Sequence, residues 1–247
     1  MATKKGPVTK EVPSTTEKDR RKRRTMSQND MLAYWTESRV FIAQRLIYVG
    51  SVTTDVEGNE SGVDAAMVHK FHIGLSILEY FDKHAPVFVR MTSFGGEYTH
   101  AMNMVDRMRQ STCPITIEGS GSVMSSGIIL MQGAHTRILT RHSRVLVHYP
   151  EHHLSGRHID DLVRQIGDAK SYNEEMERLF LKRMQVKRPE LTLEQLRQKL
   201  SYDWTMDAHE AVSWGLADQV SRSSMAQIPT PPTPPKKRGK QSETPPE

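Results

Sequence analysis

The sequence has little that would tie the protein to an oxidising compartment or to a membrane. Among its 247 residues there is one cysteine, Cys113, so no disulfide can form within the chain. No hydrophobic run reaches the roughly 18 to 20 residues that cross a bilayer. The N-terminus also lacks the apolar stretch of a secretory signal. These absences predict a cytoplasmic protein with no membrane partner.

Hydrophobic residues are also few, at 36%, and charged residues many, at 26%, which indicates that part of the chain is not packed. Residues 1–30 carry a net charge of +5 and residues 222–247 one of +3, so the remainder carries −3. We therefore predict a disordered basic N-terminal arm over 1–30, one folded domain over 31–221 and a disordered proline-rich basic tail over 222–247. The arm is a candidate for contact with nucleic acid, but a solvated basic arm explains the same residues.

Between these tails, patterns with strand and helix periodicity alternate. Strands are expected at 45–50, 87–91, 115–117 and 144–148, and helices at 65–80, 99–109, 159–184 and 207–216. A stretch of small residues, 119–127, follows the third strand. Strands separated by helices indicate an α/β fold with a mostly parallel sheet and flanking helices.

Two glycine- and serine-containing segments follow strands, where the loops of open α/β folds gather functional groups. The paired glycines of Ser-Phe-Gly-Gly at 93–96 can turn backbone N–H groups toward an anion, and a tight turn explains them equally well. In 119–127, a serine before an apolar helix is either a nucleophile close to oxyanion donors or a helix N-cap. Composition does not choose among the four serines of this stretch, Ser120, Ser122, Ser125 and Ser126.

His148 ends the fourth predicted strand and is the only one of eleven histidines placed at the end of a strongly apolar strand. Such a histidine is either a general base or a hydrogen-bonded structural residue. His152, His153 and His158 follow it, but no carboxylate or cysteine spacing supports a metal site. We predict a solvated loop there and no metal or other cofactor.

Four segments, which contain the glycine pair, the serines, His148 and Asp203, follow one another in an order that matches one protein family. They read S-F-G-G, G-S-V-M-S-S-G, S-R-V-L-V-H-Y-P and Y-D-W-T-M-D-A-H-E-A-V-S-W-G-L-A-D. Across residues 44–220 this order resembles ClpP, the proteolytic subunit of the Clp protease. The resemblance implies a ClpP/crotonase-like fold with a protruding long handle helix, and a serine endopeptidase activity.

The resemblance also assigns roles to individual residues. It makes Ser125, two residues before a glycine, the nucleophile, His148 the general base and Asp203 the residue that orients this base. The oxyanion donors would be the N–H groups of Gly96 and Ser126. A serine hydroxyl needs a neutral imidazole to take its proton, and the imidazole needs a carboxylate on its other nitrogen, so these roles are chemically consistent.

Two departures from the family pattern lie beside these residues. Phe94 stands where the family usually has proline, and Tyr149 stands where it has glutamine between the histidine and a proline. Neither change removes a catalytic atom. The basic arm stands where the family has short axial loops that help to engage an AAA+ unfoldase.

For partners, the resemblance implies peptide or unfolded protein as substrate, homo-oligomeric rings of seven subunits and an AAA+ unfoldase. The helix at 159–184 would pair two rings back to back. Its candidate contacts are Leu162, Ile166, Ala169, Met176 and Leu179; an ordinary amphipathic helix of the monomer is the alternative.

Three other functions fit parts of the sequence. Basic and proline-rich tails suit a ClpP-like protease recruited to a scaffold or nucleic acid, such as a phage-type head-maturation protease. The others are a non-catalytic ring subunit and a crotonase-fold enzyme acting on acyl thioesters. An inactive subunit would be expected to lose catalytic residues, whereas Ser125, His148 and Asp203 are all present.

Overall fold

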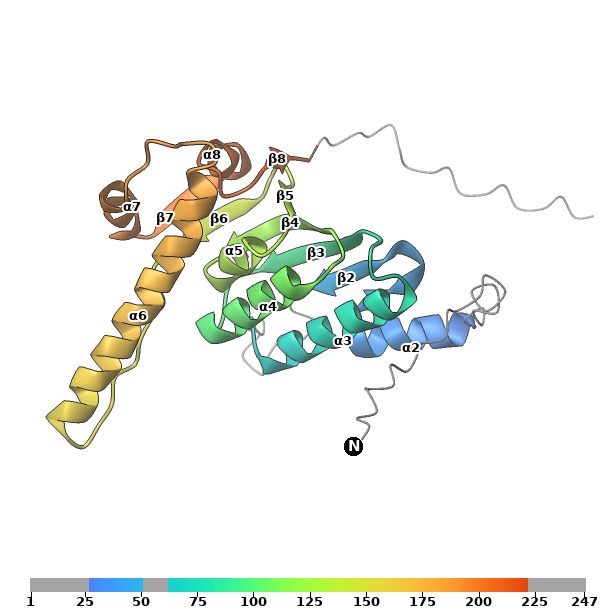
Figure 1. The fold of residues 1–247 in the computed structure, drawn as a ribbon, viewed down its shortest axis with the longest axis horizontal. Coiled ribbons are helices and arrows are strands. Elements are labelled where there is room, and N and C mark those ends of the chain that lie inside the picture. Colours follow the sequence, from blue (N-terminus) through green and yellow to red (C-terminus); the bar gives the residue numbers. More distant parts are fainter. Residues whose placement is uncertain (1–26, 51–61, 222–247) are drawn as a thin grey trace, which may run out of the picture.

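A mostly parallel sheet forms the centre of the computed structural model, which describes residues 27–50 and 62–221 (Figure 1). Its eight strands within the described residues are β1 (Val40–Phe41), β2 (Leu46–Val49), β3 (Val87–Ser93), β4 (Ile115–Met124), β5 (Thr136–Leu139), β6 (Arg144–Val147), β7 (Trp204–Asp207) and β8 (Gln219–Val220). The helices there are α2 (Gln28–Ser38), the short 3₁₀ helix η1 (Ile42–Gln44), α3 (Ala65–Phe81), α4 (Tyr98–Gln110), α5 (Ser126–Met131), α6 (Ile159–Met184), α7 (Leu193–Leu200) and α8 (Ala208–Ser213).

The main path of the sheet runs β1-β2-β3-β4-β5-β8. Strand β6 pairs with the end of β4, and β7 pairs with β6. The pairs β1–β2 and β6–β7 are antiparallel and the other pairs are parallel. Parallel strands need crossover connections, and α3, α4 and α5 supply them here. The expected α/β fold with a mostly parallel sheet and flanking helices is thus confirmed.

Strand β4 is longer than the sequence pattern indicates. It was expected to end near residue 117 but continues to Met124, so most of the small-residue stretch is strand. Its first part pairs with β5 and its end with β6. Between these parts Gly121 adopts φ 61°, and the register with β3 shifts by two residues. The glycines let the strand bend without ending, which periodicity alone does not reveal.

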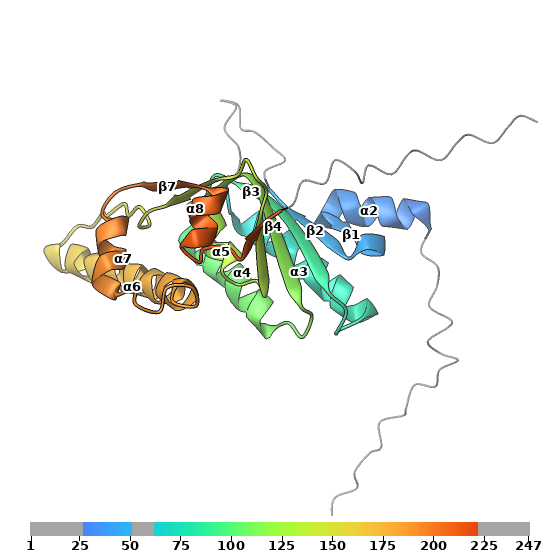
Figure 2. The same ribbon diagram turned by 90° about the horizontal axis from the view of Figure 1, so that it is seen from above.

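The helices α3 and α4 cover one face of the sheet (Figure 2). Buried side chains of these helices, including Leu75, Leu78 and Met104, form the core with alternate residues of β3 and β4 such as Ile117. On the opposite face of β3, Phe88 and Arg90 are exposed, and Phe88 has half of its surface in contact with solvent. Among the described residues, this face of β3 is therefore bare.

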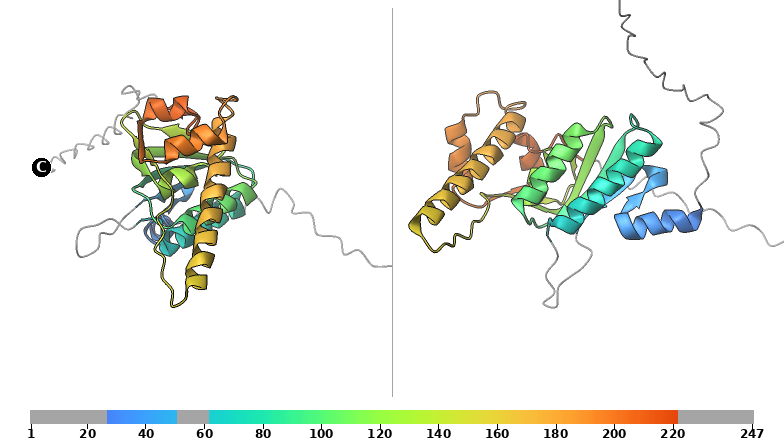
Figure 3. Two further views of the ribbon diagram at one scale, coloured as in Figure 1. Left: turned by 90° about the vertical axis from the view of Figure 1, so that its left-hand side faces the viewer. Right: turned by 60° about the horizontal axis from the view of Figure 1, so that its bottom comes forward.

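Helix α6 has the predicted bounds but two different environments along its length. Its N-terminal half stands away from the sheet (Figures 1 and 3), and Val163 is 60% exposed there. In its C-terminal half Met176 and Leu179 belong to the core of the chain. The prediction that these two residues contact another ring was therefore wrong, because packing inside the subunit already buries them.

The described part of the chain begins at the N-terminus of α2. The Ser27 side chain accepts a hydrogen bond from the Asp30 amide, and the Asp30 carboxylate accepts one from the Ser27 amide, which forms a capping box. The last few residues assigned to the basic arm therefore start a helix. The rest of the arm and the proline-rich tail lie outside the described residues. No helix of the described residues is long and apolar enough to span a membrane.

Candidate active site

Ser125 forms a sharp turn between β4 and α5. Its backbone has φ 51° and ψ −124°, a conformation that residues with a side chain rarely adopt. The Ser125 amide donates to the Leu146 carbonyl at 2.9 Å, and the Ser125 carbonyl accepts from the Ile128 amide at 3.1 Å. These bonds on both sides hold a conformation that costs of order 1–3 kcal/mol. Strain maintained in this way, on a half-buried serine, is typical of a functional position.

The other three serines of this stretch are placed differently. Ser120 and Ser122 lie within β4. The Ser126 hydroxyl is buried and donates to the Gly96 carbonyl at 2.6 Å, so it is already in use. No hydrogen bond of the Ser125 hydroxyl is found within the described residues. Among the four serines that composition leaves open, the strained turn singles out Ser125.

The Gly95-Gly96 turn lies directly against Ser125. The two glycines adopt φ 128° and φ 138°, and a Cβ on Gly95 would stand 2.6 Å from the Ser125 Cβ. Val63 holds the turn, because its amide donates to the Gly95 carbonyl at 2.6 Å and its carbonyl accepts from the Glu97 amide at 2.9 Å. Only glycine permits both this backbone conformation and this approach. Sequence reasoning identified the glycine pair but missed Val63, which carries no motif.

Two backbone N–H groups are available beside this contact. The bridge to Val63 uses the Gly95 carbonyl and the Glu97 amide, which leaves the Gly96 amide without an acceptor among the described residues. Ser126 is the first residue of α5, where amides lack intrahelical acceptors. The predicted oxyanion donors therefore lie on the two segments that meet at Ser125.

The pairing of β6 with β4 brings His148 to the end of the sheet where Ser125 lies. Strand β6 runs parallel to the end of β4, with Leu146 opposite Met124, and His148 is the first residue after this strand. The Leu146 carbonyl binds the Ser125 amide, so His148 follows two residues beyond a direct contact to the serine. The imidazole is partly exposed.

The antiparallel pairing of β6 with β7 brings Asp203 to the same end of the sheet as His148. In this register Val147 lies opposite Trp204, so the next step places His148 opposite Asp203. The assignment of Asp203 rested on resemblance alone, and the register gives it an independent physical reason. Within the described residues no hydrogen bond links Ser125 to His148 or His148 to Asp203. The sheet therefore gathers the three residues, but their hydrogen-bond chain is open, as in many catalytic sites without substrate.

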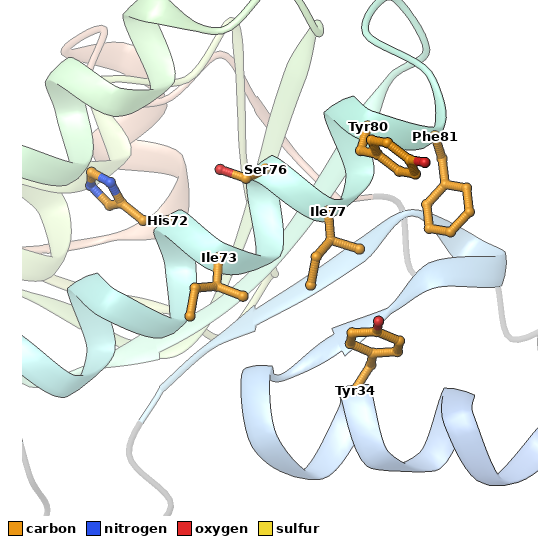
Figure 4. A pocket seen from close by; sticks show the side chains of 7 residues that line it. All are labelled: Tyr34, His72, Ile73, Ser76, Ile77, Tyr80 and Phe81. Carbon is orange, nitrogen blue, oxygen red and sulfur yellow. The ribbon is translucent and has the colours of Figure 1, made fainter.

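A second serine and histidine, Ser76 and His72, line a groove between α2 and α3 (Figure 4). The Ser76 hydroxyl accepts from the Arg107 guanidinium at 3.3 Å, and His72 Nε2 lies 2.6 Å from the Asn103 side-chain oxygen. Both groups are engaged with α4 rather than with each other. The remaining lining is aromatic and aliphatic, so this groove offers no activated nucleophile.

A metal-assisted reaction has no visible ligand set in the part of the chain that the structure describes. No group of three or more histidine, cysteine, aspartate or glutamate side chains converges there. His152 instead stacks on the Tyr172 ring, with 6.2 Å between ring centroids.

Comparison with known proteins identifies the family of the chain. The family model described as Clp protease matches residues 36–224. Three relatives are named ATP-dependent Clp protease proteolytic subunit 2. The protein from Corynebacterium glutamicum is 26% identical over 181 residues, which is 72% of this chain and 82% of the relative. Those from Corynebacterium efficiens and Corynebacterium diphtheriae are 25% and 23% identical, over 72% and 76% of this chain and 83% and 87% of theirs. Since the family model covers well over half of its length, the chain belongs to the Clp protease family.

Proposed function

We propose that the protein is a serine endopeptidase of the ClpP type, with Ser125 as nucleophile, His148 as general base and Asp203 as the residue that orients the base. The observation that carries the proposal is the strained backbone of Ser125, pressed against the Gly95-Gly96 turn. Membership of a peptidase family supports it. The register that sets His148 opposite Asp203 supports the rest of the triad.

The chemistry follows from these positions. His148 takes the proton of the Ser125 hydroxyl as the oxygen attacks the peptide carbonyl. The amides of Gly96 and Ser126 stabilise the resulting oxyanion, and one such donor is worth about 2.7–4 kcal/mol. His148 then gives the proton to the leaving amine, and water hydrolyses the acyl-enzyme by the same steps. Asp203 holds the imidazole in the required tautomer throughout.

We further propose that the enzyme works as a homo-oligomeric ring on peptides or unfolded proteins, with an AAA+ unfoldase as partner. Mostly parallel sheets are usually covered on both faces, whereas this sheet leaves side chains such as Phe88 exposed in the single chain. A neighbouring subunit would cover them. The seven-subunit ring, the unfoldase and the cytoplasmic location remain predictions. Nucleic-acid binding and the phage-type role depend on tails outside the described residues and also remain predictions.

Replacing the nucleophile tests the peptidase directly. Ser125→Ala should abolish hydrolysis of a fluorogenic peptide and labelling by a serine-directed phosphonate, with no change in native mass. Ser122→Ala is the matched control, because this half-buried serine lies in β4 away from the strained turn. It should retain both activities. Labelling of the Ser125→Ala protein at wild-type rate would show that another residue is the nucleophile.

Acyl-thioester chemistry is the rival from another class. The crotonase-type alternative needs glycine-rich oxyanion donors but not a strained serine beside a histidine and an aspartate. The same two variants separate the two activities. Turnover of an acyl-CoA that survives Ser125→Ala would favour the rival.

A further inference from the structure

Two tyrosines connect helix α6 to the two loops of the candidate site. The Tyr149 hydroxyl donates to the Glu177 carboxylate at 2.6 Å, and the Tyr98 hydroxyl donates to the Glu175 carboxylate at 2.9 Å. Both glutamates belong to α6, two residues apart. Tyr149 directly follows His148 in the chain. Tyr98 follows Gly96 by two residues and is the first residue of α4. One helix thus contacts both sides of the site.

The anchor of the first contact is a buried and charged carboxylate. Glu177 is only 4% exposed. The Arg197 guanidinium of α7 donates two hydrogen bonds to it in a bidentate arrangement, from Nε to one carboxylate oxygen at 3.0 Å and from Nη2 to the other at 2.9 Å. Burial opposes its ionisation, but the hydrogen bonds from Arg197 and Tyr149 outweigh burial and hold the pKa of Glu177 below its ordinary value. The acceptor of the Tyr149 hydroxyl is therefore fixed in place by a second helix.

The second contact is also built into packed structure. Tyr98 is 8% exposed, and its ring lies 5.4 Å from that of Tyr172 on α6, centroid to centroid. Burial and the bond to Glu175 raise the pKa of Tyr98, and burial and the bond to Glu177 raise that of Tyr149. Both phenols therefore remain protonated donors near neutral pH. Phenylalanine could fill either space but could not donate these hydrogen bonds.

We infer that Tyr149 and Tyr98 are positioning residues that fasten the His148 loop and the Gly96 loop to α6. The inference rests on the proposed peptidase function. A single helix then fixes the distance between the general base and an oxyanion donor, which come from segments about fifty residues apart in the chain. Loss of a hydroxyl leaves both groups present but lets one loop move relative to the other. Small displacements of this kind lower turnover strongly, by up to about 10²-fold for about 1 Å.

The tests are the single variants Tyr149→Phe and Tyr98→Phe, each of which deletes one oxygen atom. Tyr80→Phe is the matched control, because this tyrosine is 84% exposed on α3. We expect the first two variants to lower kcat for a fluorogenic peptide about tenfold, with KM and native mass unchanged. The rate of phosphonate labelling at Ser125 should fall in parallel, since labelling needs the same base and oxyanion donors. The control should match the wild type.

A purely structural role predicts another pattern. If the hydroxyls only stabilise the fold, the Phe variants will melt at a lower temperature but keep kcat and the labelling rate within about twofold of the wild type below that temperature. That result would overturn the inference. Glu177→Gln provides a second route, because it keeps the shape of the acceptor but removes the charge that Arg197 holds. It should lower kcat as Tyr149→Phe does, and the Phe variants decide the question if Glu177→Gln fails to fold.

Failure of the inference can be told from failure of the proposed function. If the wild type itself is neither active nor labelled at Ser125, the peptidase proposal fails. Hydrogen exchange then still tests the fastening, because the amides at 146–149 should exchange faster in Tyr149→Phe than in the wild type or in Tyr80→Phe. Unchanged exchange would reject the fastening. Faster exchange with unchanged kcat in an active enzyme would reject its role in positioning His148.

Discussion

At the scale of single residues, the strained backbone of Ser125 depends on Gly95, which lies directly against it in space. A nucleophile on a tight strand-to-helix turn exposes its side chain while the amides of the next helix turn remain free. Such a turn needs space beside it, and Gly95 provides that space by having no Cβ. The two positions therefore depend on each other. A change at Gly95 should damage catalysis without touching any catalytic atom.

Gly95→Ala is expected to lower kcat/KM by more than about 100-fold. The new Cβ would meet the Ser125 Cβ at 2.6 Å, and φ 128° is closed to alanine, so both the turn and the serine must move. Gly167→Ala is the matched control, because a Cβ on Gly167, in α6, meets nothing within 4 Å. Alanine there should stabilise the helix by up to about 1 kcal/mol. Peptide hydrolysis and thermal melting measure both effects, and full activity in Gly95→Ala would contradict the site geometry.

Much of this site was not predictable from residues alone. Composition left four serines open in the 119–127 stretch, and only the backbone of Ser125 separates them. The sequence offered no physical reason to choose Asp203, because the short strand β7, whose pairing with β6 sets Asp203 opposite His148, was not predicted. That strand has four residues and lies next to a helix motif, so its periodicity is too brief to detect. His148 was identifiable because its strand is strongly apolar.

At the scale of elements, long apolar patterns were predictive and glycine-rich or edge segments were not. Helix α6 has the predicted bounds because its charged and apolar residues alternate over many turns. Strand β4 was cut short in the prediction because glycines ordinarily end a strand. The edge strand β8 was missed because it has two residues. Backbone pairing with β5 and an ion pair beside it join β8 to the sheet.

That ion pair joins Arg137 of β5 to Asp218 just before β8. Arg137 is 3% exposed, and its guanidinium donates to both Asp218 oxygens, at 2.5 and 3.3 Å. Burial raises the pKa of Asp218, but the bonds from Arg137 outweigh it and hold the pKa below its ordinary value. The unfolded chain, with a pKa of about 3.9, therefore binds a proton at higher pH than the folded chain. The contribution of the pair is present above this pH and is lost as pH falls through the folded pKa.

Asp218→Asn should lower the unfolding free energy at pH 7 by about 1–3 kcal/mol, because a buried guanidinium loses its charged acceptor. The difference from wild type should shrink as pH falls below about 4, because the Asp218 carboxyl of the unfolded wild-type chain then binds a proton and the charge contributes less to stability. Denaturant unfolding between pH 3 and 7 measures this. Asp168→Asn, on the exposed surface of α6, is the control and should follow the wild type. A difference that stays constant down to pH 3 would rule out the charge as the cause.

At the scale of the whole molecule, the described residues leave apolar side chains exposed on two surfaces. One is the bare face of β3, and the other is the protruding half of α6, which presents a stripe formed by Ile159, Val163 and Ile166. These residues are 78%, 60% and 41% exposed and follow one another at intervals of four and three residues, which places them on one helical face. Such a stripe on a helix that leaves its own core is typical of a contact with another subunit.

Val163→Glu should therefore separate paired rings without unfolding the subunit. A carboxylate in the centre of an apolar contact must be desolvated, and no basic residue of this stripe would compensate it. Native mass spectrometry should show the wild-type mass reduced by half, while circular dichroism and the melting of the subunit stay unchanged. Ser171→Glu is the matched control, because it introduces the same side chain at an exposed position of α6 that lies off the apolar stripe, and it should keep the wild-type mass. If Val163→Glu also keeps that mass, the stripe is not the contact between rings, and the bare sheet face becomes the remaining candidate for assembly.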